Sequence, residues 1–173
     1  MTITVKEKAT NFVEAVFNAK DSDHGFRARW RRAMSPSQAQ NVWGDLTRFI
    51  DVRNAEKRLI YTLIGSAIAW EDGSVDGSQK FGKVLRECYG DRLAESVDAS
   101  SPAVMRLRRL VASRTSIEAA EVLQPILALI RSKRPGKLHY ARLMVQLSIF
   151  DLDPNQVKAE WVHDFYIPEE KKE

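Results

Sequence analysis

The stretch that decides the fold is NAEKRLIYTLIGSAIAW, residues 54–70, the most apolar segment of the sequence. Leu59, Ile60, Leu63, Ile64 and Ile68 recur at three- and four-residue steps, the spacing that places side chains on one side of an α-helix. A helix with so few polar side chains is expected to be buried. We therefore predict that residues 54–70 form the central helix of the protein.

Helical periodicity continues along nearly all of the 173 residues, and no segment shows the alternation typical of a strand. Three helix starts carry Ser or Asp before Pro, at Ser35, Ser101 and Asp153, and we expect each of these side chains to cap its helix. The glycines and serines of residues 72–78 predict a mobile loop. The expected fold class is all-α, a bundle of about eight helices in two packed halves, residues 1–98 and 99–173.

Composition excludes several classes of protein. No apolar run approaches the length of a membrane span, and the N-terminal residues lack the apolar core of a secretory signal. Cys88 is the only cysteine, which excludes an internal disulfide and fits the reducing cytoplasm. The sequence has no phosphate-binding glycine loop, no dinucleotide motif and no metal-ligand spacing. We expect a cytoplasmic protein that has no cofactor or metal and is not an enzyme.

Basic residues are concentrated in a few segments, although the net charge is only +4. Residues 101–149 contain nine Lys or Arg and two acids. The segment HGFRARWRRAM, residues 24–34, contains four arginines and no acid. In a helix, Phe26, Trp30 and Met34 form an apolar stripe, and Arg27 and Arg31 lie one turn apart beside it. Such separation of charge favours a polyanionic partner.

Two further basic segments follow: the second is residues 102–111, and the third is the turn of residues 131–137. Arginines are favoured for bidentate contacts with phosphate, so the three segments predict backbone contacts with nucleic acid that do not depend on base sequence. An ordinary solvated helix face, or cations that stabilise a helix C-terminus, would also explain single segments. The candidate nucleic-acid contacts are Arg27, Arg31, Arg32, Arg53, Arg106, Arg108, Arg109, Arg131, Lys133, Arg134 and Lys137. Three tryptophans offer rings for base stacking, but their apolar-face positions favour packing in the core: Trp43, Trp70 and Trp161.

Four motifs resemble a known family. Residues 25–33, GFRARWRRA, resemble the G-x-R-A-x-L-R-R pattern of the CasB family, the small subunit of the type I-E CRISPR surveillance complex, Cascade. Residues 80–85, KFGKVL, are similar to its F/L-G-x-x-L segment, residues 107–111, LRRLV, to its L-R-R-L-L helix, and residues 161–166, WVHDFY, to its terminal D-F-Y. The matches occur in the order of the family and span residues 25–166.

The resemblance implies a helical subunit in two parts, without catalytic activity. Two copies would lie beside the backbone subunits that hold CRISPR RNA and next to the large subunit, and would help to hold the target and displaced non-target DNA strands. Arg27, Arg31 and Arg32 match the first motif, and Arg108 and Arg109 match the third. Arg53 stands where the family also tends to carry a basic residue. Residues 150–153, FDLD, are acidic where some members are basic.

Two other classes remain open from the residues alone. A stand-alone DNA-binding regulator would use the helix after Pro102 for recognition, but Ala103, Val104 and Met105 offer no polar base-reading side chain. A helical scaffold that binds only protein would pair its arginines with acidic partners. Salt-sensitive binding without sequence preference distinguishes the Cascade subunit from both.

Overall fold

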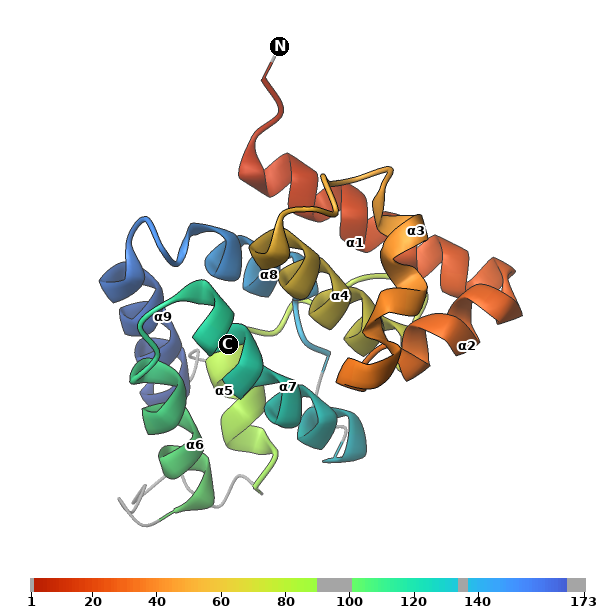
Figure 1. Cartoon of the computed structure of the whole chain (residues 1–173). Helices are drawn as coiled ribbons and strands as arrows, with labels where there is room; N and C mark the ends of the chain where they lie inside the picture. The colour runs from red at the N-terminus through yellow and green to blue at the C-terminus, as the bar shows by residue number, and fades with distance from the viewer. Residues whose placement is uncertain (1, 90–100, 134–136, 168–173) are drawn as a thin grey trace.

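A computed structural model describes residues 2–89, 101–133 and 137–167 of the chain. These residues form nine α-helices and one 3₁₀ helix, and their only β-bridge is an isolated one, so the predicted all-α class is confirmed (Figure 1). The elements are α1 (Val5–Ser22), α2 (His24–Arg32), the 3₁₀ helix η1 (Pro36–Val42), α3 (Trp43–Leu46), α4 (Ala55–Ala69), α5 (Phe81–Glu87), α6 (Pro102–Val111), α7 (Ser116–Lys133), α8 (Tyr140–Ile149) and α9 (Pro154–Tyr166).

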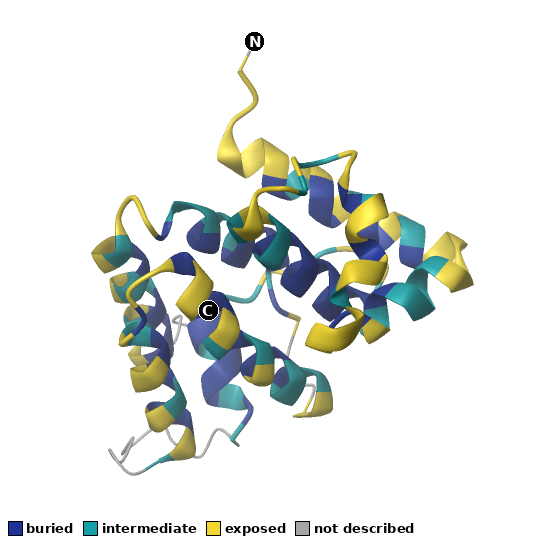
Figure 2. Ribbon diagram, viewed as in Figure 1, coloured by how far each residue is buried: buried dark blue, intermediate teal, exposed yellow. Residues whose placement is uncertain are grey.

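Helix α4 is the central helix, as residues 54–70 predicted. The side chain of Asn54 caps its start by accepting a hydrogen bond from the backbone N–H of Lys57 at 3.1 Å. All residues from Ile60 to Ala69 are buried, and α1, α2, α3, α7 and α8 all contact the helix. Figure 2 shows the dark blue, buried segments gathered where the helices meet.

Trp30 fixes how closely α2 approaches α4. Its indole is 1% exposed and lies against Gly65, where an added Cβ would come within 2.3 Å of the ring. A larger residue at position 65 would therefore push the two helices apart. The apolar stripe of the first basic segment thus packs into the core, and it orients the arginines beside it.

Helices α5 and α9 pack backbone against backbone. A Cβ on Gly82 would lie 2.6 Å from both the nitrogen of Phe165 and the carbonyl oxygen of Trp161. The Arg86 guanidinium, which is buried, donates from Nη1 to the carbonyl of Phe165 at 3.1 Å. The second and fourth motifs of the sequence therefore meet in space, and the glycine of the second motif allows the contact.

The end of the segment before α5 is held in place at Asp76 and Gly77, whereas residues 72–78 were predicted to form a mobile loop. The mobility of residues 72–75 stays a prediction. The carboxylate of Asp76 accepts hydrogen bonds from the backbone N–H groups of Tyr140 and Ala141, at 2.8 and 3.1 Å, and caps the start of α8. A Cβ on Gly77 would lie 2.2 Å from the carbonyl oxygen of Lys137. Sequence reasoning missed this because the partners lie about 60 residues away in the chain.

Only one of the three predicted side-chain caps before proline is present. Asp153 accepts a hydrogen bond from the backbone N–H of Gln156 at 3.2 Å. Ser35 and Ser101 make no capping bond with their side chains, and the hydroxyl of Ser35 lies 3.2 Å from that of Ser37 instead. A local hydroxyl partner of this kind competes with the first-turn N–H groups for the serine side chain.

Helices that pack together in space are often far apart in the chain. Helix α5 packs with α7 and α9, whereas α8 packs with α1 and α4 (Figure 1). One hydrophobic cluster includes buried residues from both sides of the predicted boundary. Most of that boundary, residues 90–100, lies outside the described residues, and the division at residue 98 stays a prediction.

Candidate nucleic-acid interface

Three arginines from two distant helices gather around Trp70, at the end of α4. The guanidinium carbon of Arg31 lies 4.7 Å from the centre of the Trp70 ring, and that of Arg131 lies 4.1 Å from it. Arg27 lies one turn before Arg31 on α2. We call Arg27, Arg31, Arg131 and Trp70 the Trp70 cluster. It brings the first basic segment together with Arg131 of the third, through a tryptophan that was expected to pack in the core.

Backbone carbonyls at the end of α4 hold two of these arginines. Arg27 donates from Nε to the carbonyl of Ala69 at 3.1 Å and from Nη2 to that of Glu71 at 2.9 Å. Arg31 donates from Nε to the same Ala69 carbonyl at 2.9 Å. The last carbonyls of a helix lack partners within it and carry partial negative charge. These guanidinium groups therefore bind the C-terminus of α4 and keep only part of their donors for a ligand.

The cluster carries more positive than negative charge. Burial lowers the pKa of Arg31, and the neighbouring positive charges of Arg27 and Arg131 lower it further, while Asp72 opposes them. The Asp72 carboxylate lies 3.8 Å from Nη2 of Arg27, and its side chain is 68% exposed. Such an exposed ion pair contributes little. An anion with several oxygens would relieve the repulsion among the guanidinium groups.

Three more candidate residues are exposed near the ends of the same elements. Arg32 follows Arg31 at the end of α2, Lys133 ends α7, and Lys137 follows the gap after it. Within the described parts of the chain, none of the three side chains has a hydrogen bond or an ion pair. Arg134 lies outside the described residues. On their helices, Arg32 lies about 100° round the axis from Arg31, and Lys133 about 200° round from Arg131.

The α6 arginines divide between two surroundings. Arg106 donates a hydrogen bond to the Tyr89 hydroxyl. Burial raises the pKa of the nearby Cys88 thiol, and the positive charges of Lys133 and Arg106 oppose part of this rise. Arg109 instead lines a shallow hollow with Glu118 and Glu121 of α7. Arg108 is exposed and has no ion-pair partner among residues 2–89, 101–133 and 137–167. Arg106 thus adjoins the third basic segment, and Arg109 faces acids.

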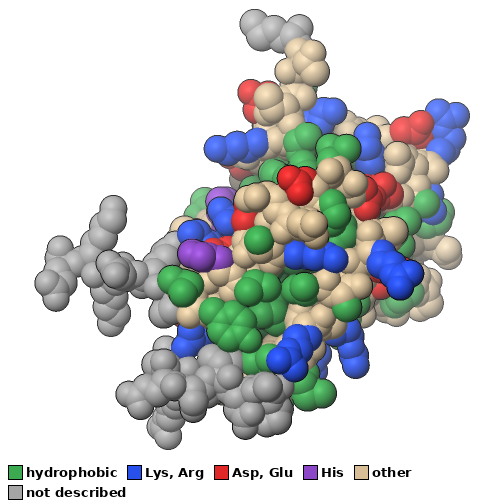
Figure 3. Space-filling model, turned by 90° about the vertical axis from the view of Figure 1, so that its left-hand side faces the viewer, with side chains coloured by type: hydrophobic (Ala, Val, Ile, Leu, Met, Phe, Trp, Pro, Cys, Tyr) green, Lys and Arg blue, Asp and Glu red, His purple; other side chains and the backbone are tan. Residues whose placement is uncertain are grey.

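Arg53 lies apart from the other candidates. It precedes α4, and the Trp70 cluster lies at the far end of that helix, about 22 Å away for 15 residues. Its guanidinium group makes a bidentate pair with Asp51, with Nε and Nη2 at 2.9 and 2.8 Å from the carboxylate oxygens. On the face shown in Figure 3, Lys and Arg side chains lie apart from one another, among hydrophobic and other polar side chains.

The structure also assigns roles to residues that the sequence left unexplained. Asp151, part of the acidic corner before α9, accepts from the backbone N–H and the hydroxyl of Ser116, both at 2.8 Å, and so fixes the start of α7. Trp161 is fully buried, as expected, and its Nε1 donates to Gln146 at 2.8 Å. Trp43, by contrast, is 36% exposed beside the guanidinium group of Arg58.

Two further observations concern membranes and metals. No helix among the described residues is both long and apolar enough to cross a bilayer. In those same residues, no three His, Cys, Asp or Glu side chains are grouped so that they could hold a metal ion.

Comparison with known proteins identifies the family. The family model of CRISPR-associated protein Cse2 matches residues 26–166, most of the chain. No curated protein and no solved structure matches the chain. The match covers the Trp70 cluster, α4 and the α5–α9 contact. The chain therefore belongs to the Cse2 family, also called CasB, the small structural subunit of the type I-E CRISPR complex Cascade.

Proposed function

We propose that this subunit holds nucleic-acid backbone for Cascade and takes no catalytic part. The target sequence is recognised by base pairing between guide RNA and target DNA. A protein subunit beside the paired strands therefore needs only a cationic surface. The Trp70 cluster would bind phosphates, and Arg32, Lys133 and Lys137 would extend that surface. In the cytoplasm, two copies beside the backbone and large subunits would stabilise the guide–target pairing and the displaced strand.

One observation carries the proposal: guanidinium groups from α2 and α7 gather around Trp70, and among the described residues their one ion pair is with an exposed carboxylate, Asp72. Asp21 lies close enough to Arg27 for that positive charge to help lower the pKa of Asp21. Arginine, which forms bidentate contacts with phosphate oxygens and stacks on aromatic rings, suits such a site. Arginines that bind phosphate oxygens carry no information about the base sequence, so the affinity is expected to depend on salt and hardly on sequence.

Binding of the full chain to unrelated single-stranded DNA, duplex DNA and RNA at several salt concentrations tests the proposal. The triple variant Arg32→Ala, Arg131→Ala, Lys133→Ala removes charges that make no described hydrogen bond or ion pair. On single strands, the slope of log affinity against log salt should fall in magnitude by about 0.7 for each phosphate that the variant no longer binds. Lys57→Ala, an exposed lysine near the other end of α4, is the control. An unchanged slope and affinity in the triple variant would refute the role of Arg131 and of the two cations that are proposed to extend its surface.

A further inference from the structure

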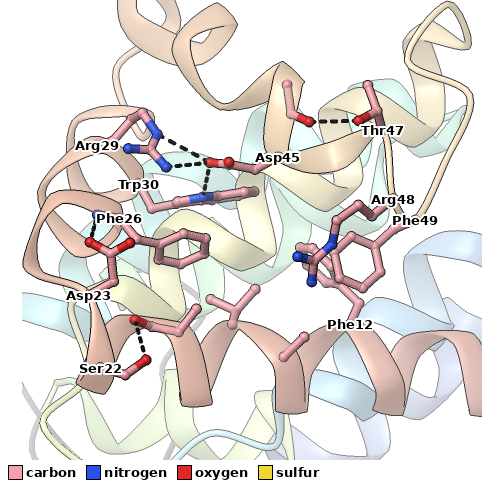
Figure 4. A pocket seen from close by; sticks show the side chains of 14 residues that line it. Phe12, Ser22, Asp23, Phe26, Arg29, Trp30, Asp45, Thr47, Arg48 and Phe49 are labelled. Carbon is pink, nitrogen blue, oxygen red and sulfur yellow. Dashed lines mark hydrogen bonds and ion pairs between the residues drawn. The ribbon is translucent and has the colours of Figure 1, made fainter.

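A second hollow lies beside the face of α2 that carries Phe26, Arg29 and Trp30. It has a volume of about 410 Å³ and is bounded by α1, α2, α3 and the turn after α3 (Figure 4). Its aromatic lining includes Phe26 and Phe49, which are half-buried, and the floor beneath them is formed by small side chains of α1, such as Ala15 and Ala19. The hollow is therefore wide enough, and flat enough at its walls, for an aromatic ring system.

One end of the hollow carries hydrogen-bond acceptors. Asp45 accepts three hydrogen bonds on one oxygen, Oδ2: from Nε and Nη2 of Arg29 at 3.2 and 2.9 Å, and from Nε1 of Trp30 at 3.0 Å. Its other oxygen, Oδ1, has no donor among the described residues, and the side chain is 32% exposed. Asp23, which lines the hollow beyond Phe26, uses Oδ1 to cap α2. Unused carboxylate oxygens at this end would accept from amino groups.

The other end carries a cation. Arg48 is exposed, and its guanidinium carbon lies 5.5 Å from the centre of the Phe49 ring. It makes no hydrogen bond or ion pair with any residue of the described ranges. In Figure 4, Arg48 and Phe49 lie across the hollow from Asp23 and Phe26. The hollow thus offers acceptors at one end, aromatic faces between and a positive charge at the other end.

We infer that this hollow binds one unpaired nucleobase of a single strand, with an adjoining phosphate on Arg48. A nucleotide matches each part: exocyclic amino groups for the carboxylates, a flat ring for the phenylalanines and a phosphate for the guanidinium group. Thymine and uracil, which lack an amino group, fit the acceptor end less well. The inference rests on the proposed function, because α2 carries this hollow on one side and Arg27 and Arg31 of the Trp70 cluster on the other.

Gly44 provides a way to close the hollow without disturbing the fold. It lines the hollow, is exposed, and an added Cβ there would meet no atom within 4 Å. Gly44→Trp is designed to fill the space, and Gly44→Ala, which leaves it open, is the matched control. Arg48→Ala is a second test variant, with Lys57→Ala as its control for the loss of one positive charge.

The full chain is mixed with a single-stranded DNA that has one central 2-aminopurine, a fluorescent base with an exocyclic amino group. Anisotropy of an end label reports binding, and 2-aminopurine emission reports stacking. Wild type and Gly44→Ala should quench the emission. Gly44→Trp should abolish the quenching and weaken binding to the strand about fivefold or more, and Arg48→Ala should weaken both, while thermal melting stays unchanged.

Binding of the strand without quenching by wild type, or equal quenching by Gly44→Trp, would overturn the inference and leave the proposed function intact. The same holds if Gly44→Trp keeps the quenching but no longer co-purifies with the other Cascade subunits, because a partner side chain would then occupy the hollow. If wild type binds no nucleic acid at all, both proposals are overturned.

Discussion

Replacing Arg27 and Arg31 by alanine should destabilise the protein strongly. The two guanidinium groups together make three hydrogen bonds to carbonyls at the end of α4, and two of these bonds converge on the carbonyl of Ala69. Ala69 is fully buried, so water does not readily replace the missing donors. The double substitution therefore removes hydrogen bonds that hold α2 against the central helix, in addition to two positive charges.

The magnitude follows from the hydrogen bonds and the ring contact. Arg27→Ala removes two partly exposed charged hydrogen bonds, about 2 kcal/mol in all. Arg31→Ala removes one hydrogen bond and the stacking on the Trp70 indole, also about 2 kcal/mol. Each single variant leaves the Ala69 carbonyl one donor, whereas the double variant leaves it none. An unsatisfied buried acceptor adds about 1–2 kcal/mol, so the double variant should be destabilised by about 5–6 kcal/mol, more than the sum.

Urea unfolding followed by circular dichroism gives the free energies of unfolding. Arg32→Ala is the matched control, because Arg32 lies next to Arg31 on α2, is exposed and has no described partner. It should change stability by no more than about 0.5 kcal/mol. If Arg27→Ala unfolds at the same urea concentration as Arg32→Ala, or if the double variant is merely additive, the reasoning about the end of α4 is wrong.

Three further changes test other parts of the fold. Gly82→Ala should cost about 2–3 kcal/mol in urea unfolding, because its Cβ would press on the backbone of α9, and Gly44→Ala should cost almost nothing; equal costs would contradict the close approach. Asp151→Ala should cost about 1–2 kcal/mol by thermal melting, because Ser116 then lacks the acceptor of two hydrogen bonds, and an unchanged melting temperature would count against this cap. Burial raises the pKa of Cys88 to about 11, so the native protein at pH 8 holds almost no thiolate there and should react with iodoacetamide far more slowly than the urea-unfolded chain; similar rates would show that the thiol is accessible. Because the folded state retains the thiol proton to higher pH, this group also lowers stability as the pH rises from its ordinary 9.0 towards 11.

Local sequence patterns were sufficient for the helices but not for all of their ends. The apolar spacing of residues 54–70 predicted α4 because burial on nearly every side requires that composition. The serines before Pro36 and Pro102 mark helix starts without capping them through their side chains. The segment containing Asp76 is fixed by hydrogen bonds with α8, which no local pattern records.

The candidate site was predictable in part. The charge of residues 24–34 and the apolar stripe through Trp30 correctly placed Arg27 and Arg31 beside a packed helix face. Their attachment to the end of α4 was not predictable, since it depends on how α2 lies against a helix about 40 residues later in the chain. One feature of the sequence pointed to the role of Trp70. It directly follows the buried helix, where its ring can lie at the edge of the core.

The close approach at Gly82 has a consequence for how the protein matures in the cell. Helix α5 leaves the ribosome long before α9 is synthesised, and until then the buried face of α5 has no permanent cover. A nascent chain tends to fold from its N-terminus while translation continues. An unfinished chain therefore keeps part of this apolar surface exposed to water until α9 has been made.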